Sequence, residues 1–153
     1  MTPPTDDITF EFCLRSVGWA DARLEIGANA TEMTPSYLTD ALGDLLRAVL
    51  TLTEGGSPAS LTWDEEGWWD YWSLVLDGDR VDLVLEFERE GANDFHPPLS
   101  GTVQLTALVR VVVDAARGIL DHHGEAGYLA QWAEHPFPVA ELRALEKWRA
   151  LHP

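Results

Sequence analysis

Hydrophobic and polar residues alternate at the start of the chain, which predicts two strands. The first alternation covers residues 8–15 and the second covers residues 20–26, with a turn near residues 16–18. A period of two places one side of each strand against a core. The short connection favours antiparallel pairing as a hairpin. Residues 1–7 are polar and contain two prolines, and we expect them to form a flexible N-terminal tail.

Hydrophobic residues three and four positions apart predict the first helix. They run from Leu38 to Leu52, follow a predicted loop over residues 27–33, and stop at the Gly55-Gly56-Ser57-Pro58 segment. Thr34 and Pro35 match the residue types preferred at the N-cap and at the first helical position. The sequence therefore predicts an amphipathic helix that starts near Pro35.

Three further strands are predicted over residues 61–65, 68–76 and 80–90. Asp77-Gly78 suits a two-residue type I′ turn between the last two of them. That turn pairs Leu76 with Asp79. Alternate residues further along the two strands, such as Leu74 and Val81, then pair on the same face. One face of the hairpin is then apolar apart from Asp70 and Asp79, whereas the opposite face mixes aromatic and acidic residues.

The C-terminal part of the chain predicts helices. After a loop over residues 91–99, helical spacing begins at Leu105 and ends near residues 121–124, followed by a short helix over 125–134 and a last helix over 139–151. The fold class is therefore α+β. We expect one domain over residues 8–153, with an antiparallel sheet of about five strands in ββαβββ order, amphipathic helices packed on one face and a C-terminal helical segment.

The charge of the chain limits its partners. It has 10 Lys and Arg residues against 26 Asp and Glu residues, a net charge of −16. This charge repels nucleic acid and anionic membrane surfaces, and it favours basic proteins. The single cysteine, Cys13, excludes an internal disulfide. Because the N-terminus also lacks an apolar signal segment, we expect a cytoplasmic location.

Acidic and aromatic residues are concentrated between Glu54 and Asp94. This segment holds twelve acidic residues, two arginines and four of the seven tryptophans. On the polar face of the predicted hairpin, exposed aromatic rings beside carboxylates are typical of the anchors of a protein interface. The residues predicted to bind a partner are Trp69, Tyr71, Asp82, Glu86 and Glu88.

Asp70 suggests an alternative site, because a carboxylate on the apolar face needs a partner or a place at the sheet margin. A small-molecule or enzymatic pocket between sheet and helices would lie near Asp70 and Trp72. The sequence has no nucleophile motif, phosphate loop or standard zinc spacing, so we expect no metal and no cofactor, and the chain is more consistent with a binding protein than with an enzyme. His96, in a loop, is the best single candidate for a functional histidine.

In size, acidity and α+β character, the chain resembles bacterial immunity proteins and antitoxins. Many of these are small cytoplasmic proteins that block a basic toxin domain. No motif carries the resemblance, so it assigns no residues. The favoured function is a non-enzymatic acidic protein that engages a basic partner protein. The alternatives are the pocket near Asp70 and a homodimer that pairs through the open sheet face.

Overall fold

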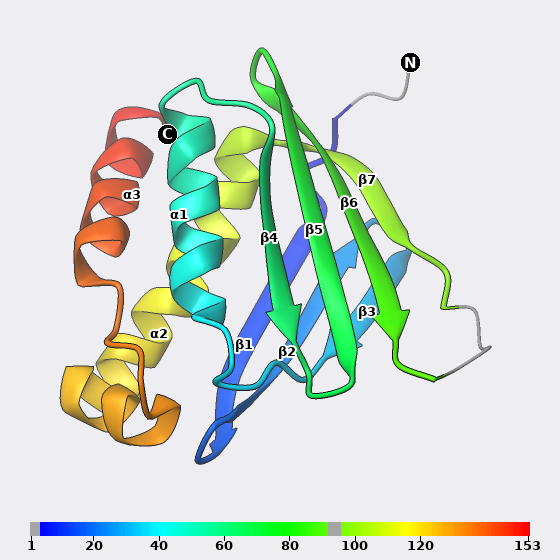
Figure 1. Cartoon of the computed structure of the whole chain (residues 1–153). Coiled ribbons are helices and arrows are strands. Elements are labelled where there is room, and N and C mark those ends of the chain that lie inside the picture. The colour runs from blue at the N-terminus through cyan, green and yellow to red at the C-terminus, as the bar shows by residue number, and fades with distance from the viewer. Residues whose placement is uncertain (1–3, 92–95) are drawn as a thin grey trace.

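The computed structural model describes residues 4–91 and 96–153, which form seven strands and three helices (Figure 1). In chain order the elements are β1 (Ile8–Ser16), β2 (Trp19–Ile26), β3 (Asn29–Met33), α1 (Ala41–Thr53), β4 (Ala59–Asp64), β5 (Trp68–Asp77), β6 (Arg80–Arg89), β7 (Leu99–Gln104), α2 (Leu105–Trp132) and α3 (Val139–Leu151). No helix within this part of the chain combines the length and apolarity needed to cross a bilayer.

The α+β prediction is confirmed, and the strands form two antiparallel sheets. One sheet has the order β1-β2-β3 and the other the order β4-β5-β6-β7. The sequence predicted about five strands because two short ones, β3 and β7, were not recognised. β3 lies in the predicted loop over residues 27–33, and β7 has a weak alternation with Gly101 at its centre. Both are edge strands whose pairing comes from their neighbours.

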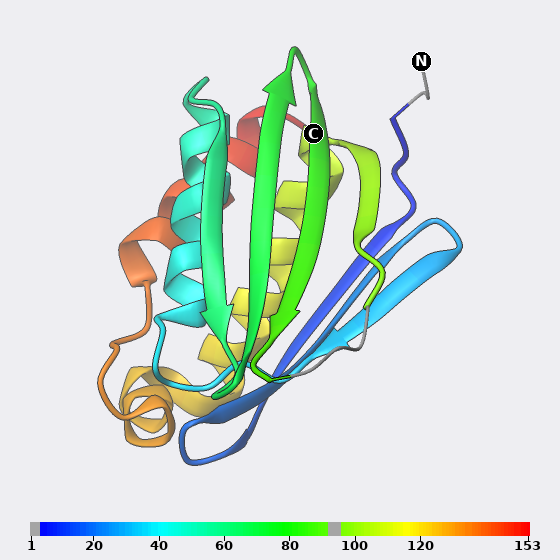
Figure 2. The same cartoon turned by 45° about the vertical axis from the view of Figure 1, so that its right-hand side comes forward.

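The core lies between the inner faces of the two sheets and the helices. β7 approaches β2 and β3, whereas α1 lies beside β4 and α2 beside β1 (Figures 1 and 2). Aromatic rings from both sheets and from α2 meet in this space, with centroids 4.9–6.5 Å apart: Phe10, Phe12, Trp63, Trp72 and Trp132. Each ring buries a large apolar area, so this cluster ties the sheets to the helices.

The β5–β6 hairpin has a different register from the predicted one. Asp77 pairs with Arg80, so the two-residue loop is Gly78-Asp79 rather than Asp77-Gly78. Of the two loop residues, Gly78 alone has a positive φ, 64°, as the first position of a type II′ turn requires. The partner of every β5 residue therefore shifts by two. A shift of two leaves each side chain on the predicted face, so the face assignment stands.

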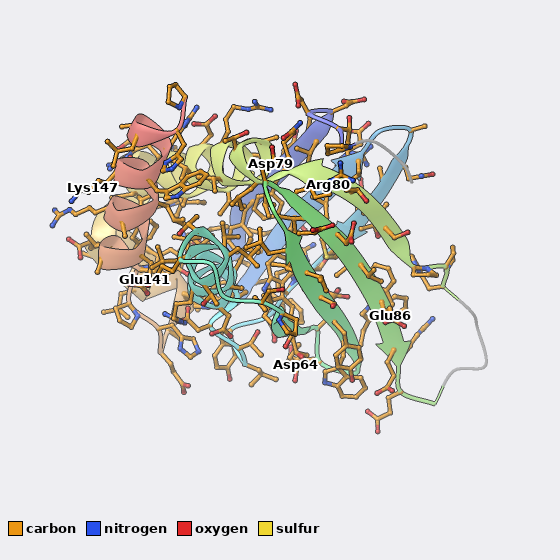
Figure 3. The ribbon with its side chains drawn as sticks, turned by 90° about the horizontal axis from the view of Figure 1, so that it is seen from above. Asp64, Asp79, Arg80, Glu86, Glu141 and Lys147 are labelled. Atoms are coloured by element: carbon orange, nitrogen blue, oxygen red, sulfur yellow. The ribbon has the colours of Figure 1, made fainter. Side chains whose placement is uncertain are left out.

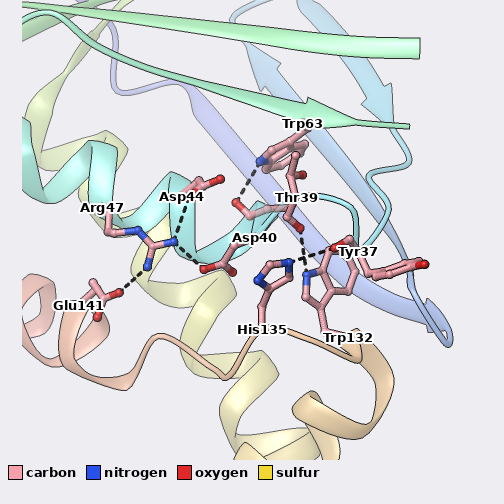
Figure 4. Close-up of polar contacts among 10 residues, drawn as sticks. Tyr37, Thr39, Asp40, Asp44, Arg47, Trp63, Trp132, His135 and Glu141 are labelled. Atoms are coloured by element: carbon pink, nitrogen blue, oxygen red, sulfur yellow. Dashed lines mark hydrogen bonds and ion pairs between the residues drawn. The ribbon is translucent and has the colours of Figure 1, made fainter. Parts of the chain in front are cut away.

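The prediction that the first helix starts at Thr34-Pro35 is wrong. α1 begins at Ala41, with Asp40 at the N-cap. Residues 34–40 instead link the two sheets, because Ser36 N–H and its hydroxyl both donate to Asp64 O at 2.8 Å. Ring nitrogens fix the rest of the segment (Figure 4): Trp63 Nε1 donates to Ala41 O, Trp132 Nε1 to Thr39 O, and His135 Nε2 lies 3.0 Å from Tyr37 O.

The C-terminal helices follow the prediction closely. α2 begins at Leu105, and Gly124 has non-helical dihedral angles (φ 69°, ψ 171°) that break it near the predicted position. α3 covers Val139–Leu151, as predicted. Arg47 of α1 joins the helices, since it donates to Asp44 on its own helix and to Glu141 of α3 (Figure 4).

Within the predicted N-terminal tail, Thr5 forms a parallel bridge to Val103 of β7. Thr5 N–H donates to Thr102 O, and Gln104 N–H donates to Thr5 O, both at 3.0 Å. The first three residues, and the loop residues 92–95 that precede His96, lie outside the described part of the chain.

Candidate functional site

The outer face of the four-stranded sheet is the surface formed by alternate residues of β4, β5, β6 and β7. Figure 2 shows this sheet in front, with the helices behind it and beside β4. In Figure 3 the labelled Asp64 and Glu86 lie away from α3, which carries Glu141 and Lys147. The residues that make up the outer face are Ser60, Thr62, Asp64, Trp69, Tyr71, Ser73, Val75, Asp82, Val84, Glu86, Glu88, Ser100 and Thr102.

The register places the predicted aromatic residues directly beside acidic ones. Trp69 pairs with Glu88, and Tyr71 pairs with Glu86. Tyr71 is 39% exposed, and both glutamates are exposed. Asp82 lies further along β6, opposite Val75, which is 41% exposed. The structure therefore brings all five predicted partner-binding residues onto one sheet face.

Hydrogen bonds hold two of these side chains in place. The Tyr71 hydroxyl donates to Glu88 Oε1 at 3.2 Å, along the diagonal of the β5–β6 ladder. Thr102 Oγ1 donates to Asp82 Oδ1 at 2.7 Å, across the β6–β7 ladder. Desolvation and the nearby Glu88 carboxylate raise the pKa of Tyr71, so its hydroxyl stays protonated and remains a donor. The face thus presents two oriented carboxylates, those of Asp82 and Glu88.

Asp70 and Trp72, the residues of the alternative pocket, are both buried, at 0% and 2% exposed. Trp68 Nε1 donates to Asp70 Oδ1 at 2.9 Å, whereas the buried Asp70 Oδ2 has no hydrogen-bond partner among the described residues and the Glu65 carboxyl group lies nearby. Glu65 Oε1 in turn accepts from Thr34 N–H at 3.0 Å. Burial first, and then Glu65, raise the pKa of Asp70 from 3.8 to about 9. Asp70 therefore keeps its proton at neutral pH, and Glu65 ties the β4–β5 turn to residue 34.

No family model matches this sequence, and no curated protein does. Among solved structures, a chain of the "CdiA-CT/CdiI toxin and immunity complex from Enterobacter cloacae" is similar, with a TM-score of 0.46 and 9% sequence identity. The alignment covers 72% of this chain and 99% of that chain. A likeness of this size supports no argument about fold or function. Both therefore rest on the residues described above.

Cys13, His122 and His123 line one groove between β1 and α2, whereas His96 lies apart from them. His96 packs its ring edge-on against Phe87, with ring centroids 4.3 Å apart, and its Nδ1 lies 3.1 Å from Pro97 O. Cys13 is exposed on β1. Across residues 4–91 and 96–153, no group of three or more His, Cys, Asp and Glu side chains is arranged to hold a metal ion.

Sequence reasoning missed the outer-face residues contributed by the flanking strands. Asp64 lies opposite Trp69, and Thr62 lies opposite Tyr71, so β4 extends the outer face beyond these two aromatic residues. Ser100 and Thr102 of β7 extend the face on the other side. The alternation of Ser60, Thr62 and Asp64 was a signal for β4. For β7 the sequence offered little, since its strand character depends on pairing with β6.

Proposed function

We propose that this chain is a non-enzymatic binding protein that engages a basic partner protein through the outer face of the four-stranded sheet. One observation carries the proposal: a sheet face that no helix of the described residues covers places Trp69 and Tyr71 beside Glu86 and Glu88. Aromatic residues that lie near the centre of an interface supply much of the binding energy.

The charge of the face fits a basic partner. Asp64, Asp82, Glu86 and Glu88 lie on one face of a chain whose net charge is −16. Complementary charge accelerates the encounter between proteins and excludes partners of like charge. The aromatic residues then stabilise the complex after contact. Charge on this face therefore acts mainly on association, and the rings act mainly on dissociation.

The proposed class of partner is a basic toxin domain, and the proposed location is the cytoplasm. Immunity proteins and antitoxins, which this chain resembles in size, acidity and α+β character, block such domains by covering them. A second copy of this chain is a poorer occupant of the outer face, because the carboxylates of the two copies would meet there. Nucleic acid is excluded by the same repulsion.

The test is a pull-down from native lysate with the wild-type chain and the Trp69→Ala/Tyr71→Ala variant, at low and high salt. The partner captured by the wild type is then identified, purified and titrated against both proteins. We expect a basic protein whose complex weakens with salt, and whose affinity for the variant falls by about 2 kcal/mol or more.

A matched control is Leu129→Ala/Leu151→Ala, which truncates two exposed hydrophobic residues on α2 and α3, away from the outer face. This control should bind the partner as the wild type does. Equal affinity of the wild type and the Trp69→Ala/Tyr71→Ala variant contradicts the proposal. So does a captured partner that is acidic, or a complex whose affinity is independent of salt.

A further inference from the structure

A groove runs along the free edge of β1, on a different part of the molecule from the outer face. Its volume is about 530 Å³. One wall consists of five consecutive β1 residues, Phe10 to Leu14, and the other of α2 residues that include Asp114, Ala115, Gly118 and Ile119. We call it the edge groove. Five residues of strand extend roughly 17 Å, which is the length of a short extended peptide.

The β1 wall exposes unpaired main-chain groups. Gly27 N–H donates to Asp7 O, so this pair is a hydrogen-bonded one in the β1–β2 ladder. Hydrogen-bonded and non-hydrogen-bonded pairs alternate along an antiparallel ladder, so the odd-numbered residues 9–13 bond to β2. The even-numbered residues therefore direct N–H and C=O toward the groove. Within the described part of the chain these groups have no hydrogen-bond partner; they belong to Phe10, Phe12 and Leu14.

The α2 wall leaves space for an added strand. A Cβ atom placed on Gly118 meets no other atom within 4 Å, and Ala115 is one turn earlier on the helix. Small side chains let another main chain approach the helix closely. The apolar wall of Phe10, Phe12 and Ile119 supplies the contact surface beneath that chain.

Charge selects the occupant. Two carboxylates line the edge groove, Glu11 from β1 and Asp114 from α2, and His122 and His123 line it at the further end of α2. Asp114 already accepts from Arg149 at 2.7 Å, whereas Glu11 has no ion-pair partner among the described residues. A second copy of the chain would bring another β1, with its own Glu11, to the same edge, and each copy carries a charge of −16. An extended segment with Lys or Arg next to Glu11 is the favoured occupant.

We propose that the edge groove binds an extended, basic segment of a partner protein, which adds to β1 as a fourth strand of the β1-β2-β3 sheet. The main-chain groups of Phe10, Phe12 and Leu14 provide the hydrogen bonds. Alternate side chains of the segment face Glu11 on one side and the apolar wall on the other. An exposed strand edge is a recurrent template for this kind of peptide recognition.

The probe is the hexapeptide acetyl-Arg-Val-Arg-Val-Arg-Val-amide, titrated into the ¹⁵N-labelled full chain and followed by NMR. We expect the amide signals of Phe10, Phe12 and Leu14 to shift and to gain protection from hydrogen exchange. Gly118→Trp fills the groove from a position where a side chain has room, and it should weaken binding by at least about tenfold. The same peptide N-methylated at alternate residues lacks main-chain N–H donors, and it should bind the wild type as weakly as the unmodified peptide binds Gly118→Trp. This control requires no change to the protein.

The Trp69→Ala/Tyr71→Ala variant separates this inference from the proposed function, because it alters only the outer face. It should bind the peptide as the wild type does. Unshifted amides on β1, shifts confined to β5 and β6, or equal binding of the N-methylated peptide each overturn the edge-groove proposal. A Glu-Val counterpart peptide should not bind. Tight binding of that peptide would contradict the charge argument.

Discussion

Asp70 is a residue at which burial opposes ionisation. Its pKa rises from 3.8 to about 9, first because it is buried and second because Glu65 lies beside it. Between these two values the folded chain keeps a proton that the unfolded chain releases. The free energy of unfolding therefore falls as pH rises from about 4 toward 9, and this cost is absent below the unfolded pKa. Asp70 thus makes the protein less stable at neutral pH than at mildly acidic pH.

We expect Asp70→Asn to raise the free energy of unfolding at pH 8 by more than about 1 kcal/mol. The amide keeps an oxygen for Trp68 Nε1 and places an N–H group where Asp70 Oδ2 has no partner among the described residues, and the unfolded variant has no carboxyl group to ionise at this position. Urea unfolding at pH 5 and pH 8 measures the effect. The gain should be smaller at pH 5, where ionisation of Asp70 stabilises the unfolded chain by a smaller free energy than at pH 8.

Asp82→Asn is the control for Asp70→Asn, because Asp82 is an exposed carboxylate on the neighbouring strand. It should change the free energy of unfolding by no more than about 0.5 kcal/mol. If Asp70→Asn destabilises the chain at pH 8, the neutral form assigned to Asp70 is wrong.

At the scale of elements, the two sheets come into close contact where β7 passes β2. A Cβ atom on Gly101 of β7 would lie 2.6 Å from Ile26 Cγ2 of β2. We expect Gly101→Ala to lower the free energy of unfolding by about 1–3 kcal/mol, because the side chain overpacks this contact. Denaturant unfolding measures it.

The matched variant at this scale is Gly118→Ala on α2, where an added Cβ meets open space. It should stabilise the chain by up to about 1 kcal/mol, since alanine favours a helix over glycine. If both alanine variants are destabilising to the same degree, close approach of the sheets is not what requires glycine at position 101.

The elements also show where sequence patterns were sufficient. β1, β2, β5 and β6 were predicted because each alternates with a period of two, and α3 was predicted because Pro136 and Pro138 mark a break just before it. The predicted β5–β6 register differs from the observed one by two residues. Asp77-Gly78 and Gly78-Asp79 are both possible two-residue loops, and only the backbone conformation distinguishes them. The start of α1 was missed because Pro35 and Ser36 are held by contacts with β2 and β4.

At the scale of the whole molecule, a net charge of −16 opposes compact folding through self-repulsion. We expect the melting temperature to rise when salt increases from about 0.01 M to 0.15 M, because the Debye length shortens to about 8 Å. Calorimetry at both salt concentrations tests this. Glu86→Gln/Glu88→Gln removes two charges from the outer face and should reduce the rise. A melting temperature that falls with salt would show that ion pairs such as Arg47–Glu141 outweigh the repulsion.

Charge on the outer face also controls association with the proposed partner. Glu86→Lys/Glu88→Lys should slow the association rate by roughly tenfold at low salt and flatten its salt dependence, because the face no longer attracts a basic protein. Stopped-flow mixing with the captured partner measures this rate. An unchanged association rate would place the partner on another surface.

The sequence by itself determined the α+β class, the acidic charge and the side of the β5–β6 hairpin on which Trp69, Tyr71, Glu86 and Glu88 lie. These properties are local, because a period of two fixes alternate faces even when the register slips by two. Tertiary structure alone decided that the strands divide into two sheets, that Glu65 accepts a hydrogen bond from Thr34, and that α2 forms a groove with β1. Each of these depends on segments distant in the sequence, whose contacts no local pattern records.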